Sequence, residues 1–248
     1  MRTLVALCVA VWLTTATAQP AAEVIRRAVE TPARSAADRE RDARDKPAEL
    51  MAFAGIVPGM TIADIFGAGG YYTELFSYAV DPTGRVLLVN NMSYRNSATE
   101  ELRTRLGNNR LGNVEHRLVE ASYMRLPANS LDLAVIVMSY HDLYYVDERG
   151  WPAIDVERFF ASVHQALKPG GHFLIVDHTA APGSGKASAQ DLHRIDPQFA
   201  MEDISGRGFV LEKSWDGLRN PADDLGKNVF DSAVRGKTDR FVHLYRKR

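Results

Sequence analysis

The chain has 248 residues, of which 46% are hydrophobic and 25% are charged, and its formal net charge is -1. This length and composition suit one domain with a sizeable core, and they exclude an intrinsically disordered or low-complexity protein. A charge close to zero provides no basic surface for DNA or RNA, so we expect no nucleic-acid partner.

The N-terminal residues have the pattern of a secretory signal peptide. Arg2 precedes an apolar run from Leu4 to Leu13, and Ala16-Thr17-Ala18 supplies the small residues of a cleavage site. We predict a signal peptide over 1–18, cleavage after Ala18, and a periplasmic or secreted protein without a stable membrane span. The run is shorter than the roughly 20 residues of a transmembrane helix, although an uncleaved anchor is the alternative. The only cysteine, Cys8, lies in this run, so the mature chain would contain no thiol.

Residues 19–46 are predicted to form an N-terminal helical extension before the main domain, 47–248. Ile25, Ala28 and Val29 have the spacing of one helix face. The run from Arg39 to Lys46 alternates in charge, which favours a solvated helix face or cap. Arg41, Arg44 and Lys46 are weaker candidates for contacts to a ligand carboxylate.

Strand-like and helix-like segments alternate along the main domain. The predicted strands are 61–66, 85–89, 114–120, 131–138, 172–176, 209–215 and 240–245, and the predicted helices are 72–80, 93–109, 156–167 and 197–207. Residues 131–138 are apolar almost without interruption, as in a parallel strand buried on both faces. We predict an α/β fold with a doubly wound, mostly parallel sheet of about seven strands, which binds ligands at the carboxyl ends of the strands.

The first of these strands runs directly into a glycine-rich turn and a helix, from Asp64 to Glu74. Gly67, Gly69 and Gly70 tolerate positive φ and allow backbone N–H groups to approach a ligand closely. The same pattern occurs in turns that bind nothing, so its meaning depends on the rest of the chain.

Four segments together resemble the class I S-adenosylmethionine-dependent methyltransferases, over nearly the whole mature chain. They are the glycine turn, Gly84 to Asn90, Leu131 to Met138, and Leu167-Lys168-Pro169-Gly170-Gly171 before an apolar strand. The last segment is the most specific, and its glycines and proline also explain why the preceding helix stops there. The resemblance implies a Rossmann-like methyltransferase fold, S-adenosylmethionine as cofactor, and methyl transfer to a small-molecule acceptor. The alternatives are an exported, non-catalytic small-molecule or nucleoside-binding protein on this scaffold and a metal-dependent enzyme of another type.

The resemblance places the cofactor at the ends of the first three strands. The implied cofactor-binding residues are Asp64, Gly67, Gly69, Gly70, Asn90, Glu120 and Ala121. Asp64 would order the turn near the amino-acid end of the cofactor, or simply cap the turn. Asn90 stands where an Asp or Glu commonly accepts hydrogen bonds from the ribose hydroxyls. Glu120 would contact the adenine amino group, or be an ordinary strand-end carboxylate. Phe66 and Ala68 occupy positions that are commonly glycine.

Aromatic and ionisable residues follow the fourth and fifth strands, where the methyl acceptor would lie. We predict catalytic roles for Tyr140, His141 and Asp142, with His141 accepting a proton and Asp142 orienting it, although a structural histidine is the alternative. The predicted acceptor contacts are Tyr144, Tyr145, His178 and His193, because tyrosine rings pack on flat molecules and attract a sulfonium cation. Imidazoles and carboxylates also bind divalent metals, but no spacing here is diagnostic, so no metal ligand is predicted. The loop from Pro182 to Lys186 is expected to be a flexible lid.

Overall fold

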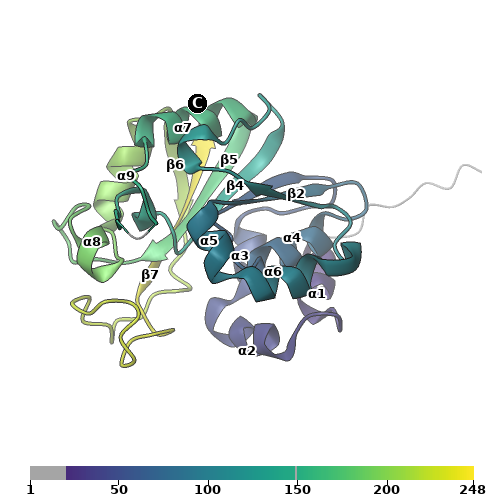
Figure 1. The fold of residues 1–248 in the computed structure, drawn as a ribbon, viewed down its shortest axis with the longest axis horizontal. Helices are drawn as coiled ribbons and strands as arrows, with labels where there is room; N and C mark the ends of the chain where they lie inside the picture. Colours follow the sequence, from purple (N-terminus) through teal and green to yellow (C-terminus); the bar gives the residue numbers. More distant parts are fainter. Residues whose placement is uncertain (1–20, 149) are drawn as a thin grey trace, which may run out of the picture.

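The computed structural model describes residues 21–148 and 150–248, so the predicted signal peptide lies outside the described residues. A single seven-stranded sheet runs through the molecule in the order β3-β2-β1-β4-β5-β7-β6 (Figure 1). The strands are β1 Thr61–Ile65, β2 Arg85–Asn90, β3 Val114–Leu118, β4 Leu131–Val137, β5 Leu167–His178, β6 Phe209–Ser214 and β7 Arg240–Lys247. The pairs among β1 to β5 are parallel, and β7 runs antiparallel to both β5 and β6. The predicted doubly wound, mostly parallel sheet is therefore confirmed.

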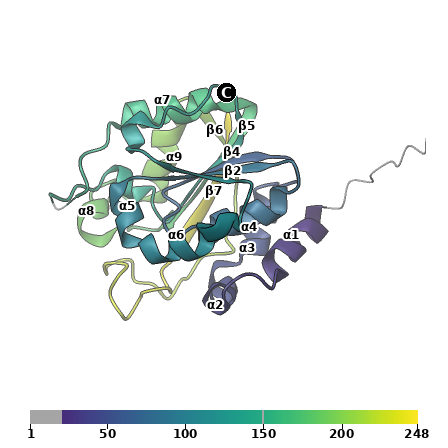
Figure 2. The same ribbon diagram turned by 45° about the vertical axis from the view of Figure 1, so that its right-hand side comes forward.

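Helices cover both faces of this sheet (Figure 2). Because alternate strand residues point to opposite faces, neighbouring positions enter different cores. Ile62 of β1 packs in a core with residues of α1 Ala21–Glu30, α3 Pro47–Phe53 and α4 Tyr71–Val80. Ala63, the next residue, packs in a core with residues of α7 Val156–Ala166 and α9 Pro197–Ser205. The sheet is thus packed between two layers of helices, and the carboxyl ends of its parallel strands lie at one edge of this sandwich.

The segment predicted as one helix over 93–109 is instead broken. It contains α5 Met92–Ser97, α6 Thr99–Leu106 and the short 3-10 helix η1 Gly107–Asn109. The break falls at Ala98, whose φ of −121° is not helical. Ala98 and Leu102 are buried together against Leu88 of β2, so the second piece turns to pack on the sheet. Three further short helices, η2 Ala121–Tyr123, η3 His141–Leu143 and α8 Ser188–Leu192, were not predicted.

The charge run of α2 Ala36–Asp45 forms the predicted solvated face in part, because Arg39, Glu40 and Arg44 are exposed whereas Asp45 is buried. The Asp45 side chain is fully buried and forms ion pairs with Arg41 on its own helix and with Arg240 of β7. Asp42 accepts a hydrogen bond from the Tyr71 hydroxyl of α4 at 2.6 Å. The partners of the buried side come from distant segments of the chain, and they anchor α2 beside the carboxyl ends of the strands.

Candidate functional site

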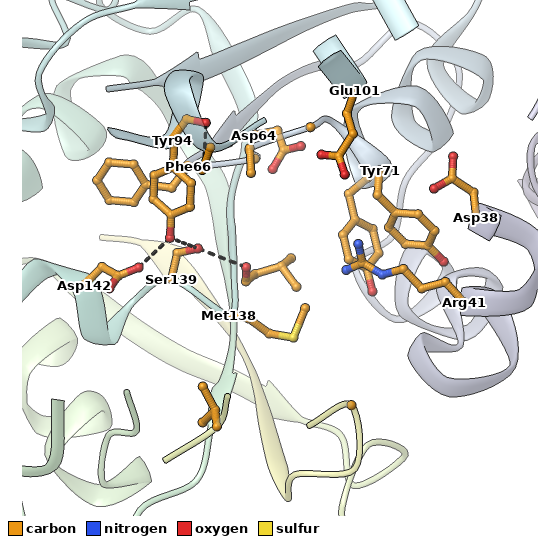
Figure 3. A pocket seen from close by; sticks show the side chains of 18 of the residues that line it. Asp38, Arg41, Asp64, Phe66, Tyr71, Tyr94, Glu101, Met138, Ser139 and Asp142 are labelled. Atoms are coloured by element: carbon orange, nitrogen blue, oxygen red, sulfur yellow. Dashed lines mark hydrogen bonds between the residues drawn. The ribbon is translucent and has the colours of Figure 1, made fainter. Parts of the chain in front are cut away.

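A cavity of about 1000 Å³ lies at the carboxyl ends of β1, β4 and β5. Its walls include α2, the glycine turn, α5, α6, the segment after β4, and residues 229–240 (Figure 3). The predicted site residues that line it are Asp64, Gly67, Gly69, His141, Asp142, Tyr145, His178 and His193. Those that do not line it are Gly70, Asn90, Glu120, Ala121, Tyr140 and Tyr144. The loop from Pro182 to Lys186, expected to be a lid, does not line the cavity. Residues of the 229–240 segment line it.

The glycine turn has a different backbone path from the predicted one. Positive φ occurs at Phe66 (59°), Ala68 (48°) and Gly70 (79°), but not at Gly67 or Gly69. The prediction that the glycines provide positive φ is therefore correct for Gly70 alone, which begins α4. The non-glycine positions adopt left-handed conformations that cost free energy and persist only where the surrounding structure holds them.

Gly67 and Gly69 are required for packing within the protein itself. A Cβ on Gly67 would lie 2.5 Å from Asp64 Oδ2 and 2.6 Å from a Leu88 methyl carbon. A Cβ on Gly69 would lie 2.2 Å from Glu101 Oε2, because this side chain of α6 lies over the turn (Figure 3). Sequence reasoning missed Glu101, since nothing in the α6 sequence distinguishes it from a surface carboxylate.

Asn90 binds the glycine turn and not the cavity, which corrects the predicted ribose contact. Its side-chain oxygen accepts the Ala68 N–H at 2.9 Å, and its amide nitrogen donates to the Ala68 carbonyl at 2.9 Å. The residue is fully buried. An amide is needed here because one end must accept and the other must donate, which a carboxylate cannot do.

The predicted adenine contacts also lie outside the cavity. Ala121 is buried in the hydrophobic cluster that contains Phe66 and Trp151, and Glu120 immediately precedes it. The Phe66 ring stacks on Tyr94 with centroids 5.3 Å apart and lies 5.7 Å from the Trp151 ring. Phe66, the departure from the usual glycine, thus forms an aromatic wall between the turn and the segment after β4.

Tyr140 and Tyr144, predicted for catalysis and acceptor binding, do not line the cavity. Both hydroxyls donate to Asp203 Oδ2 of α9 at 2.5 Å. Tyr140 is fully buried, and its ring contacts Phe160 of α7. The contacts of both hydroxyls with Asp203 instead tie the segment after β4 to α9.

His141, by contrast, faces the cavity and is held by two acids. Its Nδ1 lies 2.9 Å from Asp177 Oδ1, and its backbone N–H donates to Asp177 Oδ2 at 2.7 Å. Its Nε2 lies 3.4 Å from Asp142 Oδ1. Burial alone would lower the pKa of His141, but the negative charges of Asp177 and Asp142 and the hydrogen bond to Asp177 raise it to about 9. The two acids therefore favour the protonated form of the ring.

Two further histidines complete this cluster, as their positions near the end of β5 suggested. The ring centroids of His178 and His193 lie 6.0 and 5.4 Å from that of His141. His178 Nδ1 lies 2.7 Å from the Thr238 hydroxyl, and burial lowers the pKa of His178 well below its ordinary value. The His193 ring packs on Tyr145 with centroids 4.6 Å apart. The topology therefore brings together the predicted acceptor-side residues other than Tyr140 and Tyr144.

The opposite end of the cavity is charged (Figure 3). Arg41 of α2 lies over the Tyr71 ring at 3.9 Å from its centroid, and both residues line the cavity. Burial raises the pKa of Asp64 to about 6, although a hydrogen bond from Thr73 opposes the shift. Of the weaker candidates, Arg41 and Arg44 line the cavity, whereas Lys46 donates to the Gly217 carbonyl elsewhere.

The sheet order and the site at the carboxyl ends of its strands define a Rossmann-like methyltransferase fold, and comparisons with known proteins agree. A methyltransferase domain family matches residues 66–175. The chain is 25% identical over 187 residues to the ubiquinone/menaquinone biosynthesis C-methyltransferase UbiE of Saccharophagus degradans, covering 75% of this chain and 68% of the relative. It is 30% identical over 173 residues to the UbiE protein of Escherichia coli O1:K1, covering 69% and 61%.

Solved structures share the fold at lower identity. A methyltransferase from Aquifex aeolicus has a TM-score of 0.57 at 17% identity, covering 81% of this chain and 88% of its own. Geranyl diphosphate C-methyltransferase from Streptomyces coelicolor, solved with Mg²⁺ and S-adenosyl-L-homocysteine, has a TM-score of 0.56 at 14% identity, covering 91% and 85%. The chain therefore shares the fold of the class I S-adenosylmethionine-dependent methyltransferases.

Proposed function

We propose that the protein transfers the methyl group of S-adenosylmethionine to a small, flat acceptor bound beside Tyr145, His178 and His193. The observation that carries this proposal is the continuous cavity, which joins the glycine turn to the aromatic and histidine-rich segment after β4. Its volume of about 1000 Å³ lies at the upper end of the usual range for small-molecule sites, which accommodates a cofactor and a small acceptor together.

The charged end of the cavity fits the amino-acid end of the cofactor. Arg41 supplies a guanidinium for a carboxylate, and the Asp64 carboxyl lies at the turn, where an ammonium group would approach. The rings of Tyr71 and Tyr72 also line this end and favour a nearby cation through cation–π attraction. When bound, S-adenosylmethionine supplies an electrophilic methyl group on a sulfonium centre.

The residues predicted to bind the ribose and adenine of the cofactor do not all lie at the cavity. Asn90, Glu120 and Ala121 do not line the cavity, and Phe66 and Tyr94 form its wall there. We therefore assign no ribose or adenine contact to the three predicted residues. Glu101, whose carboxylate lies over Gly69, is the better placed acceptor for a ribose hydroxyl.

The acceptor end is walled by aromatic rings and imidazoles. Tyr145, Trp151 and Phe230 line it together with His178 and His193, which supports a flat molecule as substrate. The chain's contribution to methyl transfer is then chiefly to hold the acceptor in line and to exclude water, because such displacements depend mainly on proximity and alignment. We do not propose a ubiquinone or menaquinone precursor as the acceptor, although the names of the UbiE relatives mention these quinones.

The test is a methyl-transfer assay with isotopically labelled cofactor and a panel of phenols, hydroquinones and amines, with products identified by mass spectrometry. Tyr145→Ala should raise KM for an accepted substrate without changing the affinity for S-adenosylmethionine. The matched control is Tyr123→Ala, because Tyr123 is exposed and outside the cavity. Equal effects of the two changes, or no product from any acceptor class, would contradict the proposed acceptor site.

We also propose that the protein is exported, on the N-terminal sequence alone. Among residues 21–148 and 150–248, no helix is both long and apolar enough to cross a bilayer. Mass spectrometry of periplasmic or secreted protein should find an N-terminus at Gln19. Recovery of only the intact chain from the cytosol would overturn this proposal.

A further inference from the structure

We propose that His141, Asp142 and His193 bind a divalent transition-metal ion of the Zn²⁺ type at the acceptor end of the cavity. One donor atom from each of these side chains lies within 4.8 Å of the other two. Two imidazoles and one carboxylate suit zinc, iron or cobalt, whereas Mg²⁺ prefers oxygen ligands. The site does not depend on methyl transfer, and no spacing of residues in the chain predicted it.

The distances are already close to those of a bound ion. His141 Nε2 lies 3.4 Å from Asp142 Oδ1, and His193 Nδ1 lies 3.8 Å from the same oxygen. Two ligand atoms that each lie about 2.1 Å from a tetrahedral ion are about 3.4 Å apart. The His141 and Asp142 pair therefore needs little change, whereas the His193 donor must move closer to the other two.

The surroundings orient the three ligands. Asp177 is fully buried and accepts backbone N–H groups from His141 and His178, so its carboxylate is fixed. Its contact with His141 Nδ1 places the ring proton on that nitrogen and directs Nε2 toward Asp142. This carboxylate-to-histidine hydrogen bond is the usual support of a metal-binding imidazole.

The two carboxylate oxygens of Asp142 have different partners, so one of them is available to bind a metal ion. Its Oδ2 accepts the Tyr94 hydroxyl, and the Tyr94 oxygen also lies 2.8 Å from the Ser139 hydroxyl oxygen (Figure 3). Its Oδ1 faces the two imidazoles. Since all three ligands line the cavity, the remaining coordination positions of an ion would be open to water or to an oxygen atom of a small molecule.

The cluster also has an explanation without metal, in which a protonated His141 pairs with Asp177 and Asp142. The two accounts differ in the role of His193. A proton on His141 needs only the two acids, whereas an ion needs the second imidazole as well. The test is therefore built on His193 and on the residue that supports His141.

The experiment is calorimetric titration of the chelator-treated protein with Zn²⁺ and with Mg²⁺, and absorption spectroscopy with Co²⁺ as a probe. We expect one Zn²⁺ per chain, visible Co²⁺ bands of a site with nitrogen and oxygen ligands, and no stoichiometric Mg²⁺ binding. His193→Asn keeps a residue that tolerates the left-handed backbone at this position, φ 52°, and should weaken Zn²⁺ binding at least tenfold.

Asp177→Asn should weaken Zn²⁺ binding by about 10- to 100-fold, as expected for a residue that supports a ligand. His172→Ala is the control, because this histidine lies on β5 beside Glu212 and outside the cavity. Thermal melts establish that each variant is folded. Absence of a stoichiometric Zn²⁺ site, or equal losses in His193→Asn and His172→Ala, would overturn the metal site and leave the protonated histidine as the explanation.

Discussion

Replacement of Asn90 by Asp separates the structural role of this residue from the ribose contact that the family pattern implies. A ribose-binding Asp would tighten cofactor binding by supplying a charged acceptor. In the structure, Asn90 is fully buried and its amide nitrogen donates to the Ala68 carbonyl. An aspartate there would place a negative charge beside a carbonyl oxygen and remove the donor.

The expected cost follows from these contacts. An unsatisfied buried carbonyl costs about 1 to 3 kcal/mol, and the buried charge adds to it, so we expect a loss of about 2 to 4 kcal/mol in unfolding free energy at pH 8. The melting temperature should fall by roughly 5 to 15 °C for a chain of this size. Protonation restores a donor and removes the charge, so the variant should recover stability as the pH falls toward 5.

The assay is thermal or urea unfolding of Asn90→Asp and wild-type protein at pH 5 and pH 8, with cofactor titration at each pH. We expect weaker cofactor binding in the variant, because the left-handed Ala68 backbone loses its support. A variant of unchanged stability that binds S-adenosylmethionine more tightly than wild-type would refute this reasoning and restore the ribose contact.

Three further changes test individual assignments. Tyr140→Phe should lower stability by about 1 kcal/mol through loss of the bond to Asp203 and leave turnover unchanged, whereas a catalytic Tyr140 would give a fall of about 100-fold or more. Gly67→Ala should cost about 1 to 3 kcal/mol by overpacking, while Gly107→Ala, which meets no atom within 4 Å, should not. The pKa of Asp64 is raised to about 6, so its protonated carboxyl stabilises the fold below about pH 4 and this contribution is lost as the pH rises through 6. Urea unfolding should therefore show that, between pH 4 and pH 7, the wild-type protein loses about 3 kcal/mol of unfolding free energy relative to Asp64→Asn.

The sheet was predictable from the sequence because its strands carry continuous local signals. Leu131–Val137 is apolar except at Asp132, and the Lys168-Pro169-Gly170-Gly171 sequence marked the end of α7, although β5 begins earlier than predicted, at Leu167. The histidine cluster was also partly predictable, since parallel strands bring His141 and His178 to the same edge. The broken helix at Ala98 was not, because its cause is burial against Leu88.

The residues that face the cofactor end of the cavity could not be predicted individually, because the orientation of each side chain depends on its partners in the fold. Asn90 occupies the family position yet bonds to Ala68. Glu101 lies on an exposed-looking helix, but its carboxylate is over Gly69. Asp45 stands in a charge run, but Arg240 of β7, almost 200 positions away, buries it. These contacts are long-range, so no local pattern reveals them.

We expect the cavity beside the glycine turn to bind S-adenosylmethionine. Calorimetric titration of the protein with S-adenosylmethionine and with its demethylated product tests it most directly. We expect one site per chain for each compound, with affinity at least tenfold weaker in Arg41→Gln and unchanged in Arg39→Gln, which alters an exposed arginine of the same helix outside the cavity. Absence of binding at millimolar concentration, or equal losses in the two variants, would contradict the account.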